Sequence, residues 1–374
     1  MKIALVHDYL SQDGGAEKVL QSLQEIWPSA PIFVLFADRA RFPQFAQSDL
    51  RESFIRFLPF GRTHYRWYLP FMPIATERHN LDEFDAVISS TSAFAKGIIT
   101  RPGTLHISYC HTPTRYLWTE THEYINELSY GKIFQMLIAP LIHRLRIWDQ
   151  MSVHRVDNFV ANSDTVRRRI AKYYRRDSDI IYPPVAVEQF FVSSELGDYF
   201  ITGGRLVPYK RFDILITAAN RLREPLIIFG DGPDESRLKK MAGDTIKFVG
   251  RIDDTSKAAL LSRAKAFLHP QVEDFGITPV ESMAAGRPVI AYGAGGATET
   301  VIPGVTGVFF YEQSWEAVVE VLLNFAPLEW DSAVIRARAL KFAEANFKDR
   351  LERYVVDRYE EFTRGEKQCQ LGVR

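Results

Sequence analysis

Two glutamates are the residues of this sequence best suited to bind a polyhydroxylated ligand. Glu273 and Glu281 lie on either side of the turn Phe275-Gly276-Ile277-Thr278-Pro279. Residues Ala264 to His269 predict a buried strand before the turn, and Pro279 to Ala285 predict a helix with a proline in its first turn. One glutamate is therefore expected in a loop and the other about one turn inside a helix. Both carboxylates can then accept hydrogen bonds from one ligand.

The start of the predicted helix adds donors for an anion. The first backbone N–H groups of a helix have no partner within it, and the helix dipole favours negative charge there. Gly276 and the N–H groups of Ile277 and Thr278 are therefore expected to face an anion. Hydroxyls on both sides of a diphosphate are the chemistry of a nucleotide-sugar, which fits the whole pattern. The alternative is that each glutamate is an ordinary solvated residue.

Two cations are expected to face the same ligand from an earlier loop. Arg205 and Lys210 follow a predicted strand at Tyr199 to Thr202, and ligands of open α/β sheets bind at this end of the strands. A leaving diphosphate needs a metal ion, or fixed cations and N–H donors. The Asp177-Ser178-Asp179 string lies among charged residues and reads as solvated, so we expect no metal. Arg205 or Lys210 alone would be an ordinary surface cation.

Taken together, the segments resemble retaining glycosyltransferases of family 4, which have the two-domain GT-B fold. The string Thr114 to Trp118 resembles bacterial mannosyltransferases that build O-antigens and other surface polysaccharides, which implies GDP-mannose as the donor. Beside the two glutamates, the resemblance rests on Gly14-Gly15-Ala16-Glu17, Tyr109-Cys110-His111-Thr112-Pro113, Asn162-Ser163, Gly204 to Arg211, Gly230-Asp231-Gly232-Pro233, Phe248-Val249-Gly250-Arg251 and Gly293-Ala294-Gly295-Gly296.

The resemblance implies a role for each matching residue. Glu281 would bind the ribose hydroxyls, Glu273 would bind hydroxyls of the transferred sugar, and His111 would contact the same sugar. Arg205 and Lys210 would hold the diphosphate. The catalytic residues would be His111, Glu273, Arg205 and Lys210. Further donor-binding candidates are Gly15, Phe275, Gly276, Ile277 and Thr278, with Gly250 and Arg251 near the guanine. For Gly250 and Arg251, the alternative is an ordinary strand end with a glycine turn, and the two interpretations carry equal weight.

The implied mechanism retains the anomeric configuration. The acceptor hydroxyl attacks on the face that the diphosphate leaves and gives its proton to a phosphate oxygen, so no enzymic nucleophile and no cofactor are required. Domain closure over a cleft would exclude water.

Five residues of the N-terminal half are candidates for acceptor binding. Asp8 and Tyr9 line the loop after the first strand, where they either contact the acceptor or cap the turn. Gly14 lets a backbone approach the diphosphate or the acceptor closely. Tyr116 and Trp118 shape an acceptor cleft, or they pack in the core.

Composition and pattern predict a globular α/β protein with two Rossmann-like doubly wound domains. The chain has 374 residues, of which 46% are hydrophobic, and it carries no net charge. We expect an acceptor-binding domain over 1–183 and a nucleotide-sugar-binding domain over 184–348, with a break at Tyr182-Pro183-Pro184. The GT-B resemblance adds a final helix, about 349–374, that returns to the first domain.

Strands and helices are expected to alternate in both domains. Periodicity predicts strands at 2–7, 32–36, 86–89, 105–110 and 158–162, then at 199–202, 226–229, 246–249, 266–269, 289–291 and 308–310. Long helices are expected at 133–156 and within 334–363.

The sequence also indicates where the protein works. With two cysteines and no apolar core of a signal peptide near Met1, a cytoplasmic location is expected, and no run of about 18 apolar residues predicts a membrane span. Arg51 to Pro73 mixes arginines with aromatic residues, as in an interfacial segment. Arg167-Arg168-Arg169 and Arg175-Arg176 add a second basic patch. The segment and the patch would both suit a polyprenyl-diphosphate acceptor at the inner leaflet. The alternative for Arg51 to Pro73 is that its aromatic residues pack in the protein and its arginines are solvated. Nucleic acid is not expected.

Other functions fit parts of the pattern. Paired carboxylates also occur in glycoside hydrolases, but a hydrolase leaves Arg205 and Lys210 unexplained. A UDP-sugar-dependent relative of the same family, a nucleotide-sugar epimerase and an inactive sugar-nucleotide-binding partner are the remaining alternatives.

Overall fold

The computed structural model describes residues 1–11, 14–119, 121 and 132–371. The chain forms two compact units: unit 1 comprises Met1–Tyr182 and Lys348–Arg374, and unit 2 comprises Pro183–Phe347. These bounds lie within one residue of those expected from the sequence.

Unit 1 is built on a seven-stranded parallel sheet in the order β3-β2-β1-β4-β5-β6-β7. Its central strands are fully buried on both faces, which requires the short apolar runs seen in the sequence. The strands are β1 (Ile3–His7), β2 (Ile32–Val34), β3 (Leu50–Glu52), β4 (Ala86–Thr91), β5 (Leu105–Cys110), β6 (Asn158–Ala161) and β7 (Asp179–Ile180). The edge strands β3 and β7 were not expected, because they are short and polar.

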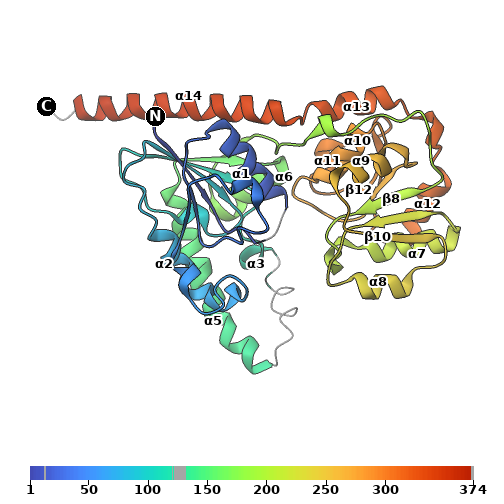
Figure 1. Cartoon of the computed structure of the whole chain (residues 1–374), viewed down its shortest axis with the longest axis horizontal. Helices are drawn as coiled ribbons and strands as arrows, with labels where there is room; N and C mark the ends of the chain where they lie inside the picture. Colours follow the sequence, from blue (N-terminus) through green and yellow to red (C-terminus); the bar gives the residue numbers. More distant parts are fainter. Residues whose placement is uncertain (12–13, 120, 122–131, 372–374) are drawn as a thin grey trace. The chain divides into compact units, whose positions relative to one another are not determined.

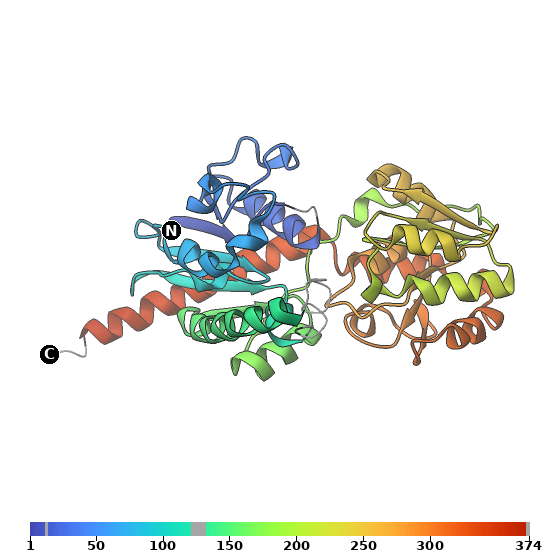
Figure 2. The same cartoon turned by 90° about the horizontal axis from the view of Figure 1, so that it is seen from below.

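The helices of unit 1 include one that comes from the far end of the chain. They are α1 (Gly15–Ile26), α2 (Met72–Glu77), α3 (Arg115–Trp118), α5 (Lys132–Ser152), α6 (Asp164–Arg169) and α14 (Glu344–Leu371), of which α14 belongs to this unit from Lys348 onward. In Figure 2, the blue N-terminal segments and the green segment that carries α5 lie on opposite sides of unit 1.

Unit 2 contains a six-stranded parallel sheet in the order β10-β9-β8-β11-β12-β13. The strands are β8 (Phe200–Gly203), β9 (Leu226–Phe229), β10 (Ile246–Gly250), β11 (Phe267–His269), β12 (Val289–Tyr292) and β13 (Gly307–Phe310). The helices are α7 (Phe212–Leu222), α8 (Glu235–Met241), α9 (Asp254–Arg263), α10 (Ile277–Ala284), α11 (Ala297–Thr300), α12 (Trp315–Leu323) and α13 (Ser332–Leu340). Figure 1 shows α7 and α8 on one side of the sheet, and α9, α10 and α11 on the other.

Each sheet has one position at which the direction of winding reverses. The reversal lies between β1 and β4 in unit 1 and between β8 and β11 in unit 2. In doubly wound folds, ligands bind beyond the carboxyl ends of the strands at this position. The expected fold class is confirmed, and it predicts one ligand-binding position in each unit.

The helical segment expected within 334–363 is interrupted. Helix α13 ends at Leu340 and α14 begins at Glu344. The turn between them is fixed because Val185 N–H donates to Phe342 O at 3.1 Å and Val185 pairs with Ala343 as a β-bridge. A continuous helix was therefore a wrong prediction at this point.

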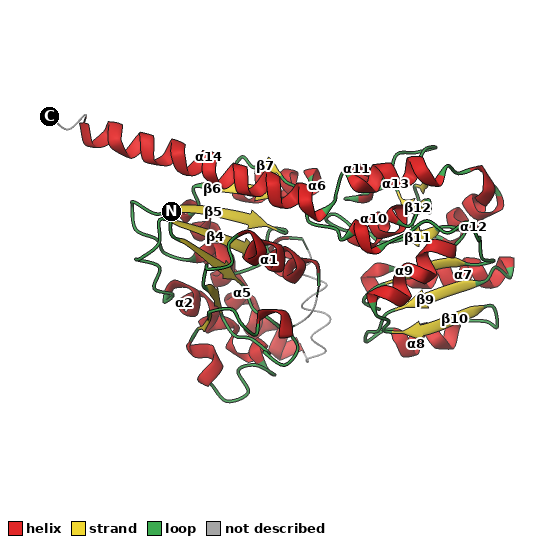
Figure 3. Cartoon of the chain, turned by 45° about the horizontal axis from the view of Figure 1, so that its top comes forward, coloured by secondary structure: helices red, strands yellow, loops and turns green. Residues whose placement is uncertain are grey.

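Helix α14 is held on unit 1 by polar contacts with β7, beside which it runs in Figure 3. The Tyr354 hydroxyl donates to Asp179 Oδ2 at 2.9 Å, and Arg350 Nη2 donates to Ile180 O at 3.1 Å. Asp179, expected to be merely solvated, thus anchors a helix. Within the described part of the chain, every helix is too short or too polar to cross a bilayer.

Candidate functional site: the two switch points

The switch point of unit 2 brings together a cation and a carboxylate that the sequence singles out. Lys210 lies in a 3-10 turn, Pro208–Lys210, after β8, and Glu273 lies in the loop between β11 and α10. Lys210 Nζ is 2.8 Å from Glu273 Oε1. Residues 63 positions apart therefore meet because β8 and β11 are neighbours in the sheet.

Glu273 is held in its anionic form. Burial favours the neutral carboxyl, but the charge of Lys210 and hydrogen bonds from Lys210 and Gln271 outweigh it and lower the pKa of Glu273 to about 2. The Gln271 amide donates to Glu273 Oε1 at 3.3 Å. A carboxylate that stays charged can accept hydrogen bonds from sugar hydroxyls, but it cannot serve as a general acid near neutral pH.

Glu281 has a lysine partner of its own, which the sequence did not reveal. It lies buried on α10, and Lys257 Nζ from α9 is 2.9 Å from its Oε1. Lys257 also lies 2.9 Å from Asp254. Although burial opposes the charge, the carboxylates of Glu281 and Asp254 raise the pKa of Lys257. The sequence signal for Lys257 is only its spacing from Asp254, because nothing local places α9 against α10.

Gly276 forms the start of α10. Its φ of 87° lies in the left-handed region, which a glycine adopts without the penalty that a Cβ would bring. Helix α10 begins at Ile277, so the N–H groups of Ile277 and Thr278 belong to its first turn, as expected. Phe275 differs from the prediction, since its buried ring packs against Phe342 at 5.5 Å between centroids. Its side chain therefore serves packing rather than the ligand.

A glycine turn supports the Glu273 loop from behind. Gly296 N–H donates to Glu273 O at 2.9 Å. A Cβ on Gly296 would lie 2.3 Å from Phe275 Cα, and one on Gly295 would lie 2.4 Å from Glu273 O. Gly295 and Gly296 thus pack backbone against backbone behind the loop that carries the carboxylate.

Two polar side chains beside Glu273 were not predicted as site residues. His269 at the end of β11 is fully buried, and among the described residues neither of its ring nitrogens has a hydrogen-bond partner. The Oε1 atom of Gln271 is also buried without one. Buried polar atoms normally have a partner, so these atoms suit a ligand with hydroxyl groups or an ordered water. The sequence signal is their place in the string from His269 to Glu273.

The remaining predicted donor-binding residues of unit 2 lie at the same edge of the sheet. Arg205 is exposed in the loop after β8, and Arg251 is exposed directly after β10. Gly250 ends β10 with a φ of 69°, and its carbonyl accepts from Gly230 N–H at 2.7 Å. Gly250 therefore also has the structural role weighed as an alternative.

At the switch point of unit 1, His111 belongs to a chain of buried polar side chains. His111 Nε2 is 2.8 Å from Ser90 Oγ, and Ser90 Oγ is 3.1 Å from His7 Nδ1. His7 Nε2 is in turn 3.9 Å from Glu17 Oε1 on α1. The four residues come from the ends of β1, β4 and β5 and from the start of α1. His7 and Ser90 were missed, although both lie near the carboxyl ends of predicted strands.

His111 is neutral in this environment. Burial, together with the nearby His7, lowers the pKa of His111 to about 3. Ser90 has a single hydroxyl proton, so it donates to one imidazole and accepts from the other. Ser90 therefore couples the tautomers of the two rings. A neutral imidazole can bind a sugar hydroxyl without adding charge.

Gly14 and Gly15 open α1 beside this chain. Helix α1 begins at Gly15, and Gly14 is its N-cap without a side-chain hydrogen bond. Both glycines are exposed. Because Gly14 has no side chain, the N-cap residue itself does not accept from the first N–H groups of this helix of 12 residues, where an anion can bind.

Comparison with known proteins identifies the family. The sequence model described as Glycosyltransferase Family 4 matches residues 13–189, and the one described as Glycosyl transferases group 1 matches residues 188–338. The chain belongs to the family 4 glycosyltransferases. The two models together match residues 13–338.

Individual relatives of this glycosyltransferase differ in substrate. It is 27% identical over 322 residues to D-inositol 3-phosphate glycosyltransferase of Mycobacterium leprae, covering 72% of this chain and 74% of the relative. It is 36% identical over 117 residues to GDP-mannose-dependent alpha-mannosyltransferase of Mycolicibacterium smegmatis, covering 31% of each chain. The crystal structure of Anabaena HepE in complex with UDP matches with a TM-score of 0.70 at 18% identity, over 96% of this chain and 100% of that one, which shows a shared GT-B fold.

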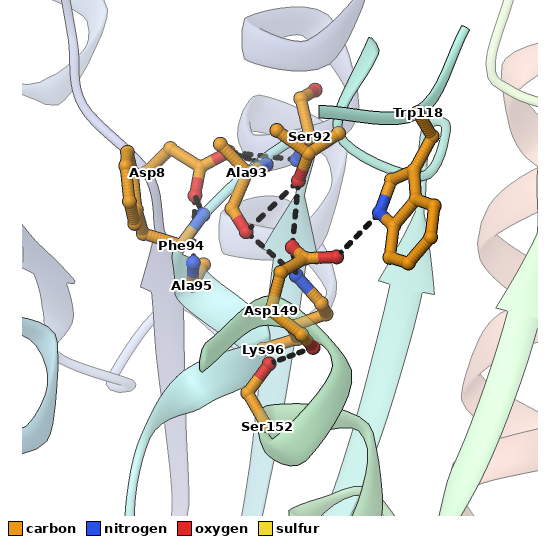
Figure 4. A network of polar contacts seen from close by, with 10 residues as sticks. Asp8, Ser92, Ala93, Phe94, Ala95, Lys96, Trp118, Asp149 and Ser152 are labelled. Atoms are coloured by element: carbon orange, nitrogen blue, oxygen red, sulfur yellow. Dashed lines mark hydrogen bonds and ion pairs between the residues drawn. The ribbon is translucent and has the colours of Figure 1, made fainter. Parts of the chain in front are cut away.

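In the glycosyltransferase, Asp8 is a structural residue. Its two carboxylate oxygens accept hydrogen bonds from four successive backbone N–H groups, from Ser92 to Ala95, at 2.6 to 2.9 Å (Figure 4). Asp8 therefore caps the turn after β4, whereas the sequence suggested that it caps the turn of its own loop or contacts the acceptor. Tyr9 stacks on Phe36 with centroids 5.2 Å apart and also belongs to the core.

Tyr116 and Trp118 pack in the same way. Trp118 Nε1 donates to Asp149 Oδ2 at 2.8 Å, and the buried Asp149 also accepts from Lys96 at 2.5 Å (Figure 4). The Trp118 ring stacks on Tyr173 at 5.3 Å, and Tyr116 packs against the hydrophobic cluster of α5. The core interpretation holds for both, so neither is retained as an acceptor residue.

Most arginines of the second predicted basic patch make contacts within the protein. Arg167 and Arg168 pair with Asp164 within α6, and Arg169 Nη1 donates to Thr112 Oγ1 at 3.1 Å. Arg176 donates to three backbone carbonyls. Arg167 and Arg168 nevertheless keep side chains that are 52% and 79% exposed, so a lipid contact of this patch stays a prediction.

Proposed function

We propose that this glycosyltransferase moves mannose from GDP-mannose to a glycan or a polyprenyl-diphosphate-linked acceptor at the cytoplasmic face of a membrane. The observation that carries the proposal is the Lys210–Glu273 pair at the switch point of unit 2. A cation for the diphosphate and a permanently charged carboxylate for the sugar stand side by side. The likeness of residues 114–118 to mannosyltransferases and the GDP-mannose-dependent relative support mannose as the sugar.

The reaction proceeds with retention and needs no enzymic base. The bond between the anomeric carbon and the diphosphate oxygen breaks as the acceptor oxygen forms a bond to that carbon from the same face. The acceptor proton passes to an oxygen of the leaving diphosphate. Lys210, Arg205 and the first N–H groups of α10 stabilise the charge that develops there, so the chain's own groups supply what a metal ion supplies elsewhere.

The other residues of the unit 2 switch point orient the donor. Glu273 binds hydroxyls of the sugar, and Glu281 binds the ribose, held in place by Lys257. At the switch point of unit 1, the neutral His111 offers a hydrogen-bonding group for a hydroxyl. A glycoside hydrolase fits less well, because its general acid needs a raised pKa, whereas the pKa of Glu273 is lowered to about 2.

A transfer assay tests the proposal. The protein is incubated in EDTA with GDP-mannose or a UDP-sugar and a lipid-linked glycan, and the glycan mass and anomeric configuration of the product are determined. The expected product carries one α-linked hexose from GDP-mannose only. Transfer from UDP-sugars alone would show that the donor is a UDP-sugar and not GDP-mannose. Release of an epimerised sugar would indicate an epimerase. If no donor is turned over, the protein would be a sugar-nucleotide-binding partner without activity.

A further inference from the structure

Unit 1 displays a group of aromatic and aliphatic side chains that its core does not use. Their exposed fractions are 73% for Phe57, 64% for Phe60, 62% for Trp67, 48% for Phe71 and 50% for Ile74. We call these five residues the aromatic surface. Single exposed apolar residues are ordinary, but a group within one short segment marks an interaction site.

The aromatic surface is ordered by contacts of its own. The Phe60 and Trp67 rings are 6.5 Å apart, and His64 lies 4.7 Å from Trp67 and 5.6 Å from Phe60. Beneath them, Tyr65 and Tyr68 pack with side chains of α5 in one hydrophobic cluster. The exposed rings are therefore presented on a packed base, and the backbone segment 54–71 that carries most of them lies beside α2 (Figure 1).

Phe60 occupies a backbone conformation that suits it poorly. Its φ of 55° lies in the left-handed region, which is unfavourable for a bulky residue. Asn or Gly would occupy this position with less strain, so the turn itself does not require a phenylalanine. What the phenylalanine adds is an exposed ring.

The charge around the aromatic surface is positive. Residues 53–76 contain no Asp or Glu, and they include Arg56, Arg62 and Arg66. The buried Glu52 carboxylate is shared by three guanidinium groups, with nitrogens of Arg39, Arg56 and Arg62 at 3.7, 3.6 and 3.1 Å. One negative charge offsets one of the three positive charges, so an excess remains.

We propose that the aromatic surface docks the enzyme on an anionic lipid bilayer. Aromatic rings partition to the depth of lipid headgroups, and arginines beside them pair with lipid phosphates. The same segment reaches the switch point of unit 1, because Tyr65 contacts Tyr9 at 5.2 Å and Tyr9 directly follows Asp8. This inference rests on the lipid-linked acceptor of the proposed function. It implies that the acceptor reaches unit 1 from the side of the aromatic surface.

Vesicle sedimentation with the full chain tests the inference. Vesicles of phosphatidylcholine are compared with vesicles that also contain phosphatidylglycerol. We expect binding to the anionic vesicles that weakens about tenfold in Phe60→Asn/Trp67→Ala, since two aromatic rings lose their burial in the interface. Leu328→Asn, which changes an exposed residue of unit 2, should bind like the natural protein.

Thermal unfolding separates binding from folding. Phe60→Asn should keep or raise the midpoint, because asparagine tolerates the left-handed region better than phenylalanine. The inference is overturned if the natural protein ignores anionic vesicles, if the double variant binds them equally, or if the substitutions abolish self-association instead. GDP-mannose affinity without vesicles is measured in parallel. If the natural protein does not bind GDP-mannose, the proposed donor is overturned, but the proposed docking surface is not.

Discussion

Lys257 Nζ lies 2.9 Å from Glu281 Oε1 and joins α9 to α10 within unit 2. With the Lys210–Glu273 contact of 2.8 Å, each of the two glutamates singled out by the sequence has a lysine partner. Each carboxylate thus has a cationic partner that orients it without a ligand, as the proposed binding of hydroxyl groups would require.

Replacing Lys257 tests whether this pair positions Glu281. Lys257→Met leaves the buried carboxylate without its cation, so we expect a loss of about 1–3 kcal/mol in the free energy of unfolding. If Glu281 binds ribose, KM for the donor should also rise while kcat changes little. Glu281→Gln added to Lys257→Met should restore part of the stability. Equal loss of kcat and kcat/KM would contradict a positioning role.

Gly296→Ala tests whether the glycine turn supports the Glu273 loop. A methyl group there would lie 2.3 Å from Phe275 Cα, and the contacting atoms belong to the backbone. The loop must shift, so we expect a loss of about 1–3 kcal/mol in stability together with weaker donor binding. Gly365→Ala on α14 meets no neighbouring atom and serves as the control. Unchanged donor affinity in Gly296→Ala would show that the loop is not held by this turn.

The fold could be predicted from the sequence because its signals are local. Apolar runs such as Leu105 to Cys110 match the observed strand residue for residue, since a strand buried on both faces must be apolar throughout. The short edge strand at Leu50–Glu52 lacked this signal. The break at Leu340 was hidden as well, because it depends on Val185, far away in the chain.

The candidate site was predictable to the extent that its residues lie in loops after predicted strands. Arg205, Lys210 and Glu273 follow this rule, and Glu281 lies in the helix that follows such a loop. Lys257 does not, because its role arises only when α9 packs beside α10. Asp8 also follows the rule and yet is structural, because the turn after β4 needs a carboxylate to accept its N–H groups. Position at a strand end thus does not by itself mark a residue as a ligand contact.

Asp8→Ala distinguishes the structural role from acceptor binding. Four buried N–H donors would lose their acceptor, so we expect a loss of about 3 kcal/mol or more in the free energy of unfolding. Chemical denaturation measures it, and Asp8→Asn, which keeps one carbonyl oxygen, should lose less. A normal unfolding midpoint combined with a raised KM for the acceptor would return Asp8 to the acceptor site.

Stability should fall steeply as the pH drops below 6.5. Burial lowers the pKa of His106 and His269 to about 4 and, with His7, that of His111 to about 3, from a usual value of 6.5. Between these values the unfolded chain binds more protons than the folded one, so each histidine removes about 1.4 kcal/mol per pH unit as the pH falls. Denaturation at pH 7.5 and 5.5 measures the slope.

One substitution checks the source of this pH dependence. His106 is held neutral between Ser89 Oγ and Arg155 O, each 2.9 Å from a ring nitrogen. His106→Asn should flatten the slope, whereas His143→Asn, at an exposed position, should leave it unchanged. Equal slopes in all three proteins would mean that other groups control acid stability.

The central claim is that the Lys210–Glu273 pair binds the diphosphate and sugar of a nucleotide-sugar. Calorimetric titration of GDP and GDP-mannose in EDTA tests it on the natural protein, Lys210→Ala, Glu273→Gln and the exposed control Lys240→Ala. Lys210→Ala should weaken both ligands at least about tenfold, because a charged contact is lost. Glu273→Gln should weaken GDP-mannose far more than GDP, and Lys240→Ala neither. Equal affinities for both ligands in all four proteins would contradict the claim.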